Sequence, residues 1–156
     1  MTNISLAQRF QESKAPKIEV DGREIYSLYE IDVSSGDTVL SFDFVSSKKS
    51  SIQGVKIRAS NCNVEVNNQI LTDFFIWLDR DPNHIPLNVR IGKGGKAILK
   101  VWNVWKYDDV VHAWIGNAAM LVKRADRHIA FHCSDGIGDP DFEDLVFTIE
   151  VGKVSK

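Results

Sequence analysis

Five acidic side chains fall within ten residues near the end of the chain, and carboxylates at this density can bind a divalent cation. They are Asp135, Asp139, Asp141, Glu143 and Asp144. Crowded carboxylates repel one another unless a cation or protons neutralise them. Calcium suits such a group because it accepts about six to eight oxygen ligands in flexible geometry, whereas zinc prefers nitrogen and sulfur. The sequence predicts a calcium site here, with a solvated acidic turn as the alternative.

The backbone of this acidic segment can curve around an ion. In an extended strand, side chains two residues apart stay about 6–7 Å from each other, whereas calcium holds its oxygens at about 2.3–2.6 Å. Gly136 and Gly138 permit unusual backbone angles, and Pro140 fixes one. An EF-hand is excluded, because Asp144 stands where that loop requires glycine. We expect Phe142 to anchor the loop to the core.

The stretch GDPDFEDLVFTIEV, residues 138–151, resembles a known calcium motif. It is similar to the D-x-D-[F/Y]-[N/D]-D-x-V segment of calcium-binding β-sandwich domains. It also resembles the C-terminal loop of calcium-dependent fucose- and mannose-binding bacterial lectins and a motif of secreted bacterial adhesin-type domains. In those lectins, two calcium ions hold sugar hydroxyls directly. The resemblance implies that Asp139, Asp141, Glu143 and Asp144 are calcium ligands, with carbohydrate as the partner.

The stretch WNVWKYDDVVHAW, residues 102–114, is a weaker second candidate for a ligand site. It contains Trp102, Trp105 and Trp114. Trp102 and Trp105 are three residues apart on an expected strand, so their side chains should point to opposite faces. An exposed indole ring could stack on a sugar ring or lie in a partner interface. The alternative is that all these rings pack inside.

No catalytic motif is recognisable. His128 and His132 lie on an expected strand, where four residues span about 13 Å, so they are poorly placed to grip one zinc ion. The chain has no G-x-S-x-G sequence for a nucleophile elbow. The acidic cluster is more crowded than the two carboxylates of a glycosidase, which stand about 5–9.5 Å apart. We expect a non-catalytic protein, with an unrecognised class of enzyme as the alternative.

The composition is that of one ordinary globular domain, residues 1–156. The chain is 44% hydrophobic and 26% charged with a formal net charge of −2. This balance provides no basic field for nucleic acid. No window approaches the roughly 20 apolar residues of a membrane span, so we expect no membrane insertion. A homo-oligomer is compatible with the composition.

Two cysteines, Cys62 and Cys133, lie far apart and form no zinc-binding spacing. We expect both to be free thiols rather than partners in a disulfide, and free thiols fit a reducing compartment. The start, MTNISLAQRF, lacks the apolar centre of a signal peptide. We therefore expect a cytoplasmic protein as synthesised, and export without a signal peptide stays open.

The elements that position these residues are short strands. Residues 5–14 favour a helix, in which Ser5 and Gln8 have capping-box spacing. Beyond it, alternating or continuously apolar segments separated by turn residues predict nine to eleven strands in one antiparallel β-sandwich, with a jelly roll as one form. The expected strand segments are 24–33, 38–46, 55–59, 62–66, 70–78, 85–91, 97–107, 113–122, 128–133 and 145–151. Segment 70–78 has the apolar character of a strand that is buried on both faces or lies at the centre of a sheet.

The sequence thus predicts a non-catalytic calcium-binding module, with carbohydrate binding through the acidic loop. The alternative is a structural or protein-interaction sandwich, such as an accessory, toxin-neutralising or assembly subunit. In that case calcium would at most tie down the last strand.

Overall fold

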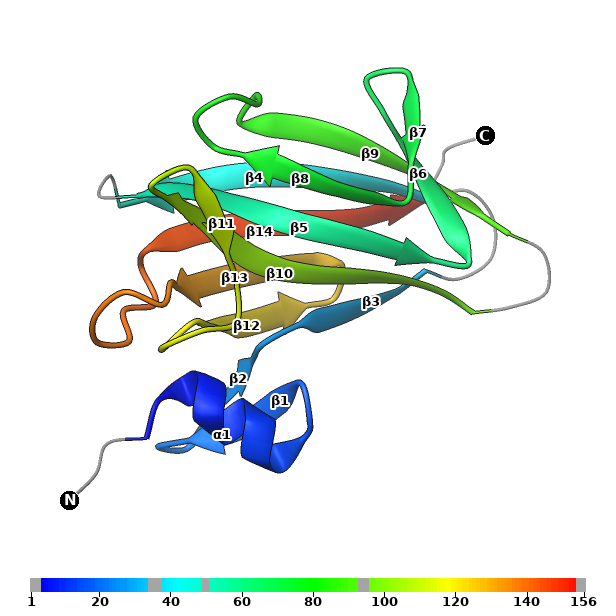
Figure 1. The fold of residues 1–156 in the computed structure, drawn as a ribbon. Helices are drawn as coiled ribbons and strands as arrows, with labels where there is room; N and C mark the ends of the chain where they lie inside the picture. The colour runs from blue at the N-terminus through cyan, green and yellow to red at the C-terminus, as the bar shows by residue number, and fades with distance from the viewer. Residues whose placement is uncertain (1–3, 34–37, 49–50, 93–95, 154–156) are drawn as a thin grey trace.

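The structure is a computed structural model that describes residues 4–33, 38–48, 51–92 and 96–153. Over these residues the chain forms one short helix, α1 (Leu6–Ser13), and fourteen strands whose pairings are all antiparallel. The turns predicted at 34–37 and 93–95 lie outside the described residues. The turn at Asn67 and Asn68 is present, with both residues at positive φ. The predicted all-β sandwich is confirmed (Figure 1).

The larger sheet has nine strands, and half of its neighbouring pairs join strands that are not consecutive in sequence. In spatial order they are β1 (Lys17–Val20), β2 (Arg23–Tyr26), β12 (Ala119–Ala125), β13 (His128–Ser134), β14 (Leu145–Lys153), β4 (Thr38–Ser47), β9 (His84–Ile91), β6 (Cys62–Val66) and β7 (Gln69–Leu71). The last strand, β14, is central, because β13 pairs with one of its edges and β4 with the other.

The smaller sheet is built around a long strand, β10 (Ala97–Tyr107), which pairs with β5 (Ile52–Ser60) along most of its length. Beyond β5 lies β8 (Asp73–Trp77). The other edge of β10 is shared by β3 (Tyr29–Val33) and β11 (Val110–His112). Residues 108–109 close the β10–β11 hairpin with both residues at positive φ.

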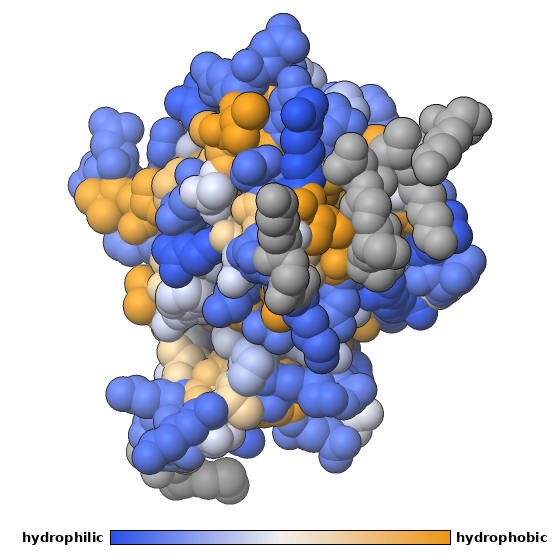
Figure 2. Space-filling model, turned by 90° about the vertical axis from the view of Figure 1, so that its right-hand side faces the viewer, coloured by the Kyte–Doolittle hydropathy of each residue, from blue (hydrophilic) through white to orange (hydrophobic). Residues whose placement is uncertain are grey.

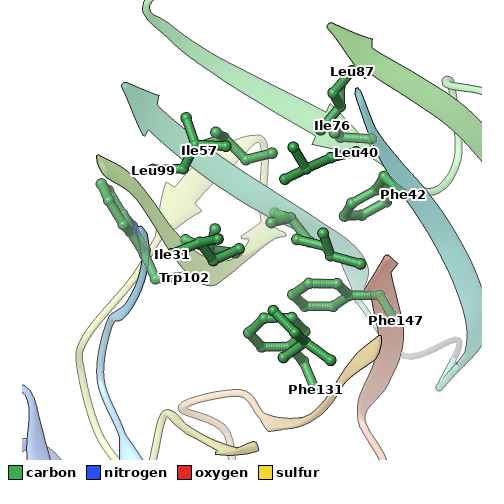
Figure 3. Close-up of a cluster of buried hydrophobic side chains, with 14 of the residues drawn as sticks. Ile31, Leu40, Phe42, Ile57, Ile76, Leu87, Leu99, Trp102, Phe131 and Phe147 are labelled. Carbon is green, nitrogen blue, oxygen red and sulfur yellow. The ribbon is translucent and has the colours of Figure 1, made fainter. Parts of the chain in front are cut away.

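The core lies between the two sheets and is formed by the apolar side chains that the strands direct inward (Figure 3). Leu40 and Leu87 enter from the larger sheet, and Ile57 enters from the smaller one; all three are fully buried. Phe131 and Phe147 stack at 4.4 Å between ring centroids. Aromatic stacking adds about 0.5–1.5 kcal/mol to the energy of burial, so these rings help fix the register of β13 on β14.

Two segments expected to be single strands are each divided between the sheets. Segment 24–33 breaks after Tyr26, where the Ser27 N–H donates to the Pro16 carbonyl at 2.9 Å. Segment 70–78 breaks at Thr72, whose carbonyl accepts from the Ala59 N–H. The expectation that 70–78 is buried on both faces is wrong, because Ile70 is 61% exposed. β7 contains no buried residue, and β8 buries only Ile76 and Trp77 at its end, so this run of apolar residues does not mark one central strand.

Segment 113–122 is a strand only from Ala119 onward. Trp114 and Gly116 have φ values of 59° and 57°, and this left-handed backbone cannot continue a strand. Residues 113–118 therefore form a loop, which leads from β11 in the smaller sheet to β12 in the larger one.

The predicted N-terminal helix is present, with a separate small core beneath it. Ser5 Oγ accepts a hydrogen bond from the Gln8 N–H at 3.2 Å, which caps the helix. Leu6 and Phe10 lie on one face and pack with Ile25 and residues of β12. Figure 1 shows α1, β1 and β2 below the main sandwich.

Figure 2 views the molecule from the right-hand side of Figure 1, away from the acidic loop. Hydrophilic side chains dominate this end, and the apolar areas between them are interrupted. Within the described residues, no helix has the length and apolar character needed to cross a membrane.

Candidate functional site

The acidic segment forms the loop between β13 and β14, at the left of Figure 1. Its five acidic residues divide into two sets. Asp135 and Asp144 are buried, with exposed fractions of 0% and 3%, whereas Asp139, Asp141 and Glu143 are exposed. Within the described ranges, no three His, Cys, Asp or Glu side chains gather in the way a metal site requires.

The buried pair has a cation of its own. Lys48 Nζ lies 2.8 Å from Asp135 Oδ2 and 3.4 Å from Asp144 Oδ1. Lys48 directly follows β4, and its backbone N–H donates to the Asp144 carbonyl at 2.9 Å. The pairing of β4 with β14 therefore brings this ammonium to the acidic loop. Sequence analysis missed Lys48, because it lies far from the loop along the chain.

Uncharged groups complete the surroundings of Asp135. Its Oδ2 accepts from Gln53 Nε2 at 3.1 Å and from Ser51 Oγ at 3.3 Å, and its Oδ1 accepts from the Ile137 N–H at 3.0 Å. The Asp135 N–H in turn donates to Asp144 Oδ2 at 2.9 Å. Gln53 is only 1% exposed, and none of the described residues gives its Oε1 a hydrogen-bond partner.

The electrostatics of this buried cluster keep the lysine charged. Burial lowers the pKa of Lys48, but its hydrogen bond to Asp135 and the negative charges of Asp135 and Asp144 outweigh burial, so the pKa is raised overall. Burial raises the pKa of the Asp144 carboxyl, and the neighbouring charge of Asp135 acts in the same direction. The hydrogen bond from the Asp135 N–H and the charge of Lys48 oppose that rise.

The exposed set mostly shapes the loop. Asp141 Oδ1 accepts from the Glu143 N–H at 3.1 Å, and the Asp141 N–H donates to Ser134 Oγ at 3.2 Å. Glu143 Oε1 lies 3.8 Å from His132 Nδ1. Phe142 does anchor the loop, but it packs against the small core under α1 rather than the main core.

As arranged, the residues do not fit the calcium site implied by the resemblance. That site would draw Asp139, Asp141, Glu143 and Asp144 around one ion, but only Asp144 is buried, and a lysine ammonium already pairs with it. Calcium binding by this loop stays a prediction.

A hollow of about 240 Å³ lies beside the acidic loop. Its lining residues come from the β10–β11 hairpin, the 113–118 loop and the acidic loop. They are Trp105, Tyr107, His112, Ile115, Gly136 and Ile137. The rings of Trp105 and His112 stack at 6.0 Å between centroids. Tyr107 is 59% exposed, so its ring is open to a ligand. The second candidate stretch of the sequence contains three of these residues, but it was singled out for its tryptophans alone.

Two glycines allow the loops around this hollow to meet. A Cβ at Gly136 would lie 2.6 Å from the Ile115 carbonyl oxygen and 2.7 Å from Trp105 Cζ2. A Cβ at Gly116 would lie 2.3 Å from the Gly136 carbonyl oxygen. Real Cβ atoms do not approach backbone oxygen so closely, so this contact requires glycine on both sides. Asn117 Nδ2 adds a hydrogen bond of 2.9 Å to the Gly138 carbonyl.

The three tryptophans proposed as ligand contacts have different environments. Trp102 and Trp105 are both buried, with exposed fractions of 4% and 1%. Trp102 packs against Trp114 at 4.7 Å between ring centroids, while Trp105 contributes to the wall of the hollow. Trp114 is 45% exposed, and its Nε1 donates to the Ser27 carbonyl at 2.8 Å. It borders a separate cavity of about 420 Å³ beside α1.

The two histidines lie on one strand, and the two cysteines are not joined. His128 and His132 both lie on β13, as the sequence predicts. Cys62 and Cys133 are free thiols. Complete burial raises the pKa of the Cys133 thiol well above its ordinary value, so it is not a reactive nucleophile.

The fold and this site together define a two-layer antiparallel β-sandwich in which an acidic loop, paired with an internal lysine, lies beside an aromatic hollow. Comparisons of the chain with protein-family models, curated proteins and solved structures found no match.

Proposed function

We propose that this protein is a non-catalytic carbohydrate-binding module that holds one sugar residue in the hollow beside the acidic loop. The observation that carries the proposal is the lining of that hollow. Three aromatic side chains, Trp105, Tyr107 and His112, meet two isoleucines there. Ligand sites are mostly apolar concavities with a few polar groups that fix orientation.

The chemistry of the hollow matches a sugar ring. The C–H groups on a sugar face pack against aromatic rings, and the sugar hydroxyls need hydrogen-bond partners at the rim. The Tyr107 hydroxyl and the His112 imidazole are polar groups of the lining. Asp139 and Asp141 follow the lining residue Ile137 in the same loop and are exposed. Carboxylates accept strong hydrogen bonds from hydroxyl groups.

The size of the hollow favours a single sugar residue. Its volume of about 240 Å³ is below the roughly 300–1,000 Å³ of sites for drug-sized ligands. A longer glycan would extend past the exposed side of Tyr107 into solvent. We therefore expect recognition of a terminal residue with weak dependence on the rest of the chain.

Binding is proposed to be independent of calcium, because Lys48 already provides the buried half of the acidic loop with a cation. A glycan array probed once in calcium and once in chelator tests this. The proposal expects the same sugars in both conditions. Binding seen only in calcium would support the calcium-dependent lectin predicted from the sequence, and an array without any signal would refute the carbohydrate proposal.

The site itself is tested by variants of Tyr107, with affinity measured by titration calorimetry on the best array sugar. Tyr107→Ala removes the exposed ring and should weaken binding by about fivefold or more, since an aromatic contact contributes about 1 kcal/mol or more. Tyr107→Phe keeps the ring and should retain most of the affinity. Phe75→Ala removes a partly exposed ring on β8, outside the hollow, and should leave binding unchanged.

A second candidate is self-association through the same end of the molecule. Val110, Val111, Ile115 and Ile137 are each more than 40% exposed there. Sedimentation analysis across a concentration series distinguishes the two functions. Self-association abolished by Val110→Asp, together with an empty glycan array, would favour a protein-interaction module.

A further inference from the structure

A cavity of about 420 Å³ lies between α1, the chain that crosses from β2 to β3, and the 113–118 loop. Its volume falls within the roughly 300–1,000 Å³ of small-molecule sites. We propose that this cavity binds an amphipathic anion, which is a molecule with an apolar body and one anionic group such as a carboxylate. Lys14 would bind the anionic group, and Leu28 and Trp114 would contact the apolar body. The lining residues differ from those of the hollow beside the acidic loop.

Two residues of this lining have a left-handed backbone that their residue types disfavour. Nine non-glycine residues of the described chain have positive φ, and seven of them are aspartate or asparagine, which adopt this conformation comparatively readily. The other two are Lys14, with a φ of 56°, and Trp114, with a φ of 59°, and both line the cavity. Strained backbone of this kind clusters at ligand sites, so its occurrence at both residues points to a ligand between them.

The side of the cavity around Trp114 is apolar because its polar groups pair with one another. Trp114 Nε1 donates to the Ser27 carbonyl at 2.8 Å, and the Ser27 N–H donates to the Pro16 carbonyl at 2.9 Å. The indole ring packs against Trp102 at 4.7 Å between ring centroids, and it is still 45% exposed. Since the only donor of the indole is already used, a ligand that touches this ring meets apolar surface.

The charge of the cavity comes from Lys14. The polar side chains of the lining are Gln11, Lys14 and Ser27, and within the described part of the chain no acidic residue lines the cavity. Lys14 is exposed and forms no ion pair with another described residue, whereas Lys17 pairs with Glu24 at 2.9 Å. An ammonium without a partner beside an apolar cavity favours an anionic group, which it can bind through a charge-assisted hydrogen bond.

The class of ligand is tested by titration calorimetry with three probes. Decanoate and decyltrimethylammonium have the same apolar chain and opposite charges, and 1-naphthoate has an aromatic body with a carboxylate. Wild type should bind decanoate or 1-naphthoate at least about tenfold more tightly than decyltrimethylammonium. The inference is overturned if neither anion binds, or if the decyl cation binds as tightly as the better anion.

The location of the site is tested with variants and the better of the two anions. Lys14→Gln removes the ammonium and should weaken binding by about fivefold or more. Lys17→Gln removes a nearby lysine outside the lining and should leave the affinity unchanged. Ala7→Leu keeps a good helix former on α1, fills part of the cavity and should abolish binding. Equal affinities of the two lysine variants would overturn the inference, and so would full binding by folded Ala7→Leu. If Ala7→Leu does not fold, the two lysine variants decide.

Lys14→Gly separates the strain at this position from its charge. Glycine adopts positive φ readily and is the usual residue where a helix ends in this conformation. Lys14→Gly should therefore raise the melting temperature by about 2–4 °C and weaken anion binding as much as Lys14→Gln does. A higher melting temperature with unchanged affinity would overturn the inference, because the lysine would then serve no ligand. None of these readouts depends on a sugar, so the outcome is separate from that of the proposed function.

Discussion

Two clusters in this molecule pair a lysine with aspartate, and they lie in different environments. Lys48 meets Asp135 and Asp144 inside the protein, where the carboxylates are 0% and 4% exposed. Lys56 meets Asp73 on the surface of the smaller sheet, where the carboxylate is 44% exposed. Arg58 joins the surface cluster at 3.4 Å from Asp73.

The comparison indicates that burial, rather than distance, decides how much an ion pair contributes to the free energy of unfolding. An exposed pair is screened by water and contributes about 0–1 kcal/mol. Removing one partner of a buried pair leaves an uncompensated charge, which costs about 3–5 kcal/mol. The acidic loop therefore depends strongly on its internal cation, whereas β5 and β8 would remain paired without Asp73.

The largest effect is expected for Asp135→Ala. This change leaves Lys48 with the Asp144 carboxylate at 3.4 Å and removes the acceptor for Gln53 and Ser51. We expect the free energy of unfolding to fall by about 3–5 kcal/mol, measured by chemical denaturation near neutral pH. Asp139→Ala in the same loop, at an exposed position, should change it by less than about 0.5 kcal/mol. Equal losses in the two variants would contradict the comparison.

An intermediate effect is expected at Gly136, the residue after Asp135. Gly136→Ala places a methyl group 2.6 Å from the Ile115 carbonyl oxygen, so the loops must separate. We expect a loss of about 1–3 kcal/mol together with weaker sugar binding, because Gly136 also lines the hollow. Denaturation and calorimetry measure the two losses.

Gly138→Ala is the matched control for that prediction. No atom lies within 4 Å of a Cβ built there, and the cost comes only from the positive φ of 76°. A loss near 1 kcal/mol with unchanged sugar affinity is expected. If Gly138→Ala weakened binding as much as Gly136→Ala, the contact with Ile115 would not be what shapes the hollow.

The smallest effect is expected from the surface cluster, and it depends on pH. The hydrogen bond from Lys56, together with the charges of Lys56 and Arg58, holds the pKa of Asp73 below its ordinary value of 3.8. A carboxyl whose pKa is lower in the folded state stabilises the fold above its ordinary pKa. That contribution is lost as the pH falls below about 3.8 towards the folded-state pKa.

The pH dependence can be isolated by subtraction. Wild type and Asp73→Asn are denatured between pH 5 and about pH 2.5, and the difference in their free energies of unfolding is followed. The difference should be at most about 1 kcal/mol at pH 5 and should vanish at the acid end. A difference that grows upon acidification would reverse the expected sign.

Local sequence patterns accounted for most of the fold. Alternation predicted strands such as 38–46 and 85–91, and the spacing of Ser5 and Gln8 predicted the helix. The errors came where the chain passes between sheets within a few residues. Thr72 is the example, because neither its neighbours nor their hydrophobicity mark a change of sheet.

The candidate site was less predictable for a physical reason. The acidic residues are near each other in sequence, but Lys48 and Gln53 lie more than 80 residues away and arrive through sheet pairing. An acidic motif read alone therefore suggests an external ion, although the fold provides its own cation. Tyr107 and His112 meet Ile137 only after three loops have been placed together.

The first turn of α1 is hydrogen-bonded to the 113–118 loop, which lies beside the hollow. The Leu6 N–H donates to Asn117 Oδ1 at 3.1 Å, and the Ala7 N–H donates to the Gly116 carbonyl at 2.9 Å. The same loop touches Gly136 and donates to the Gly138 carbonyl. The first turn of α1 thus holds the 113–118 loop in place at the rim of the hollow. Deleting the helix would change the shape of the hollow, although α1 contributes no side chain to its lining.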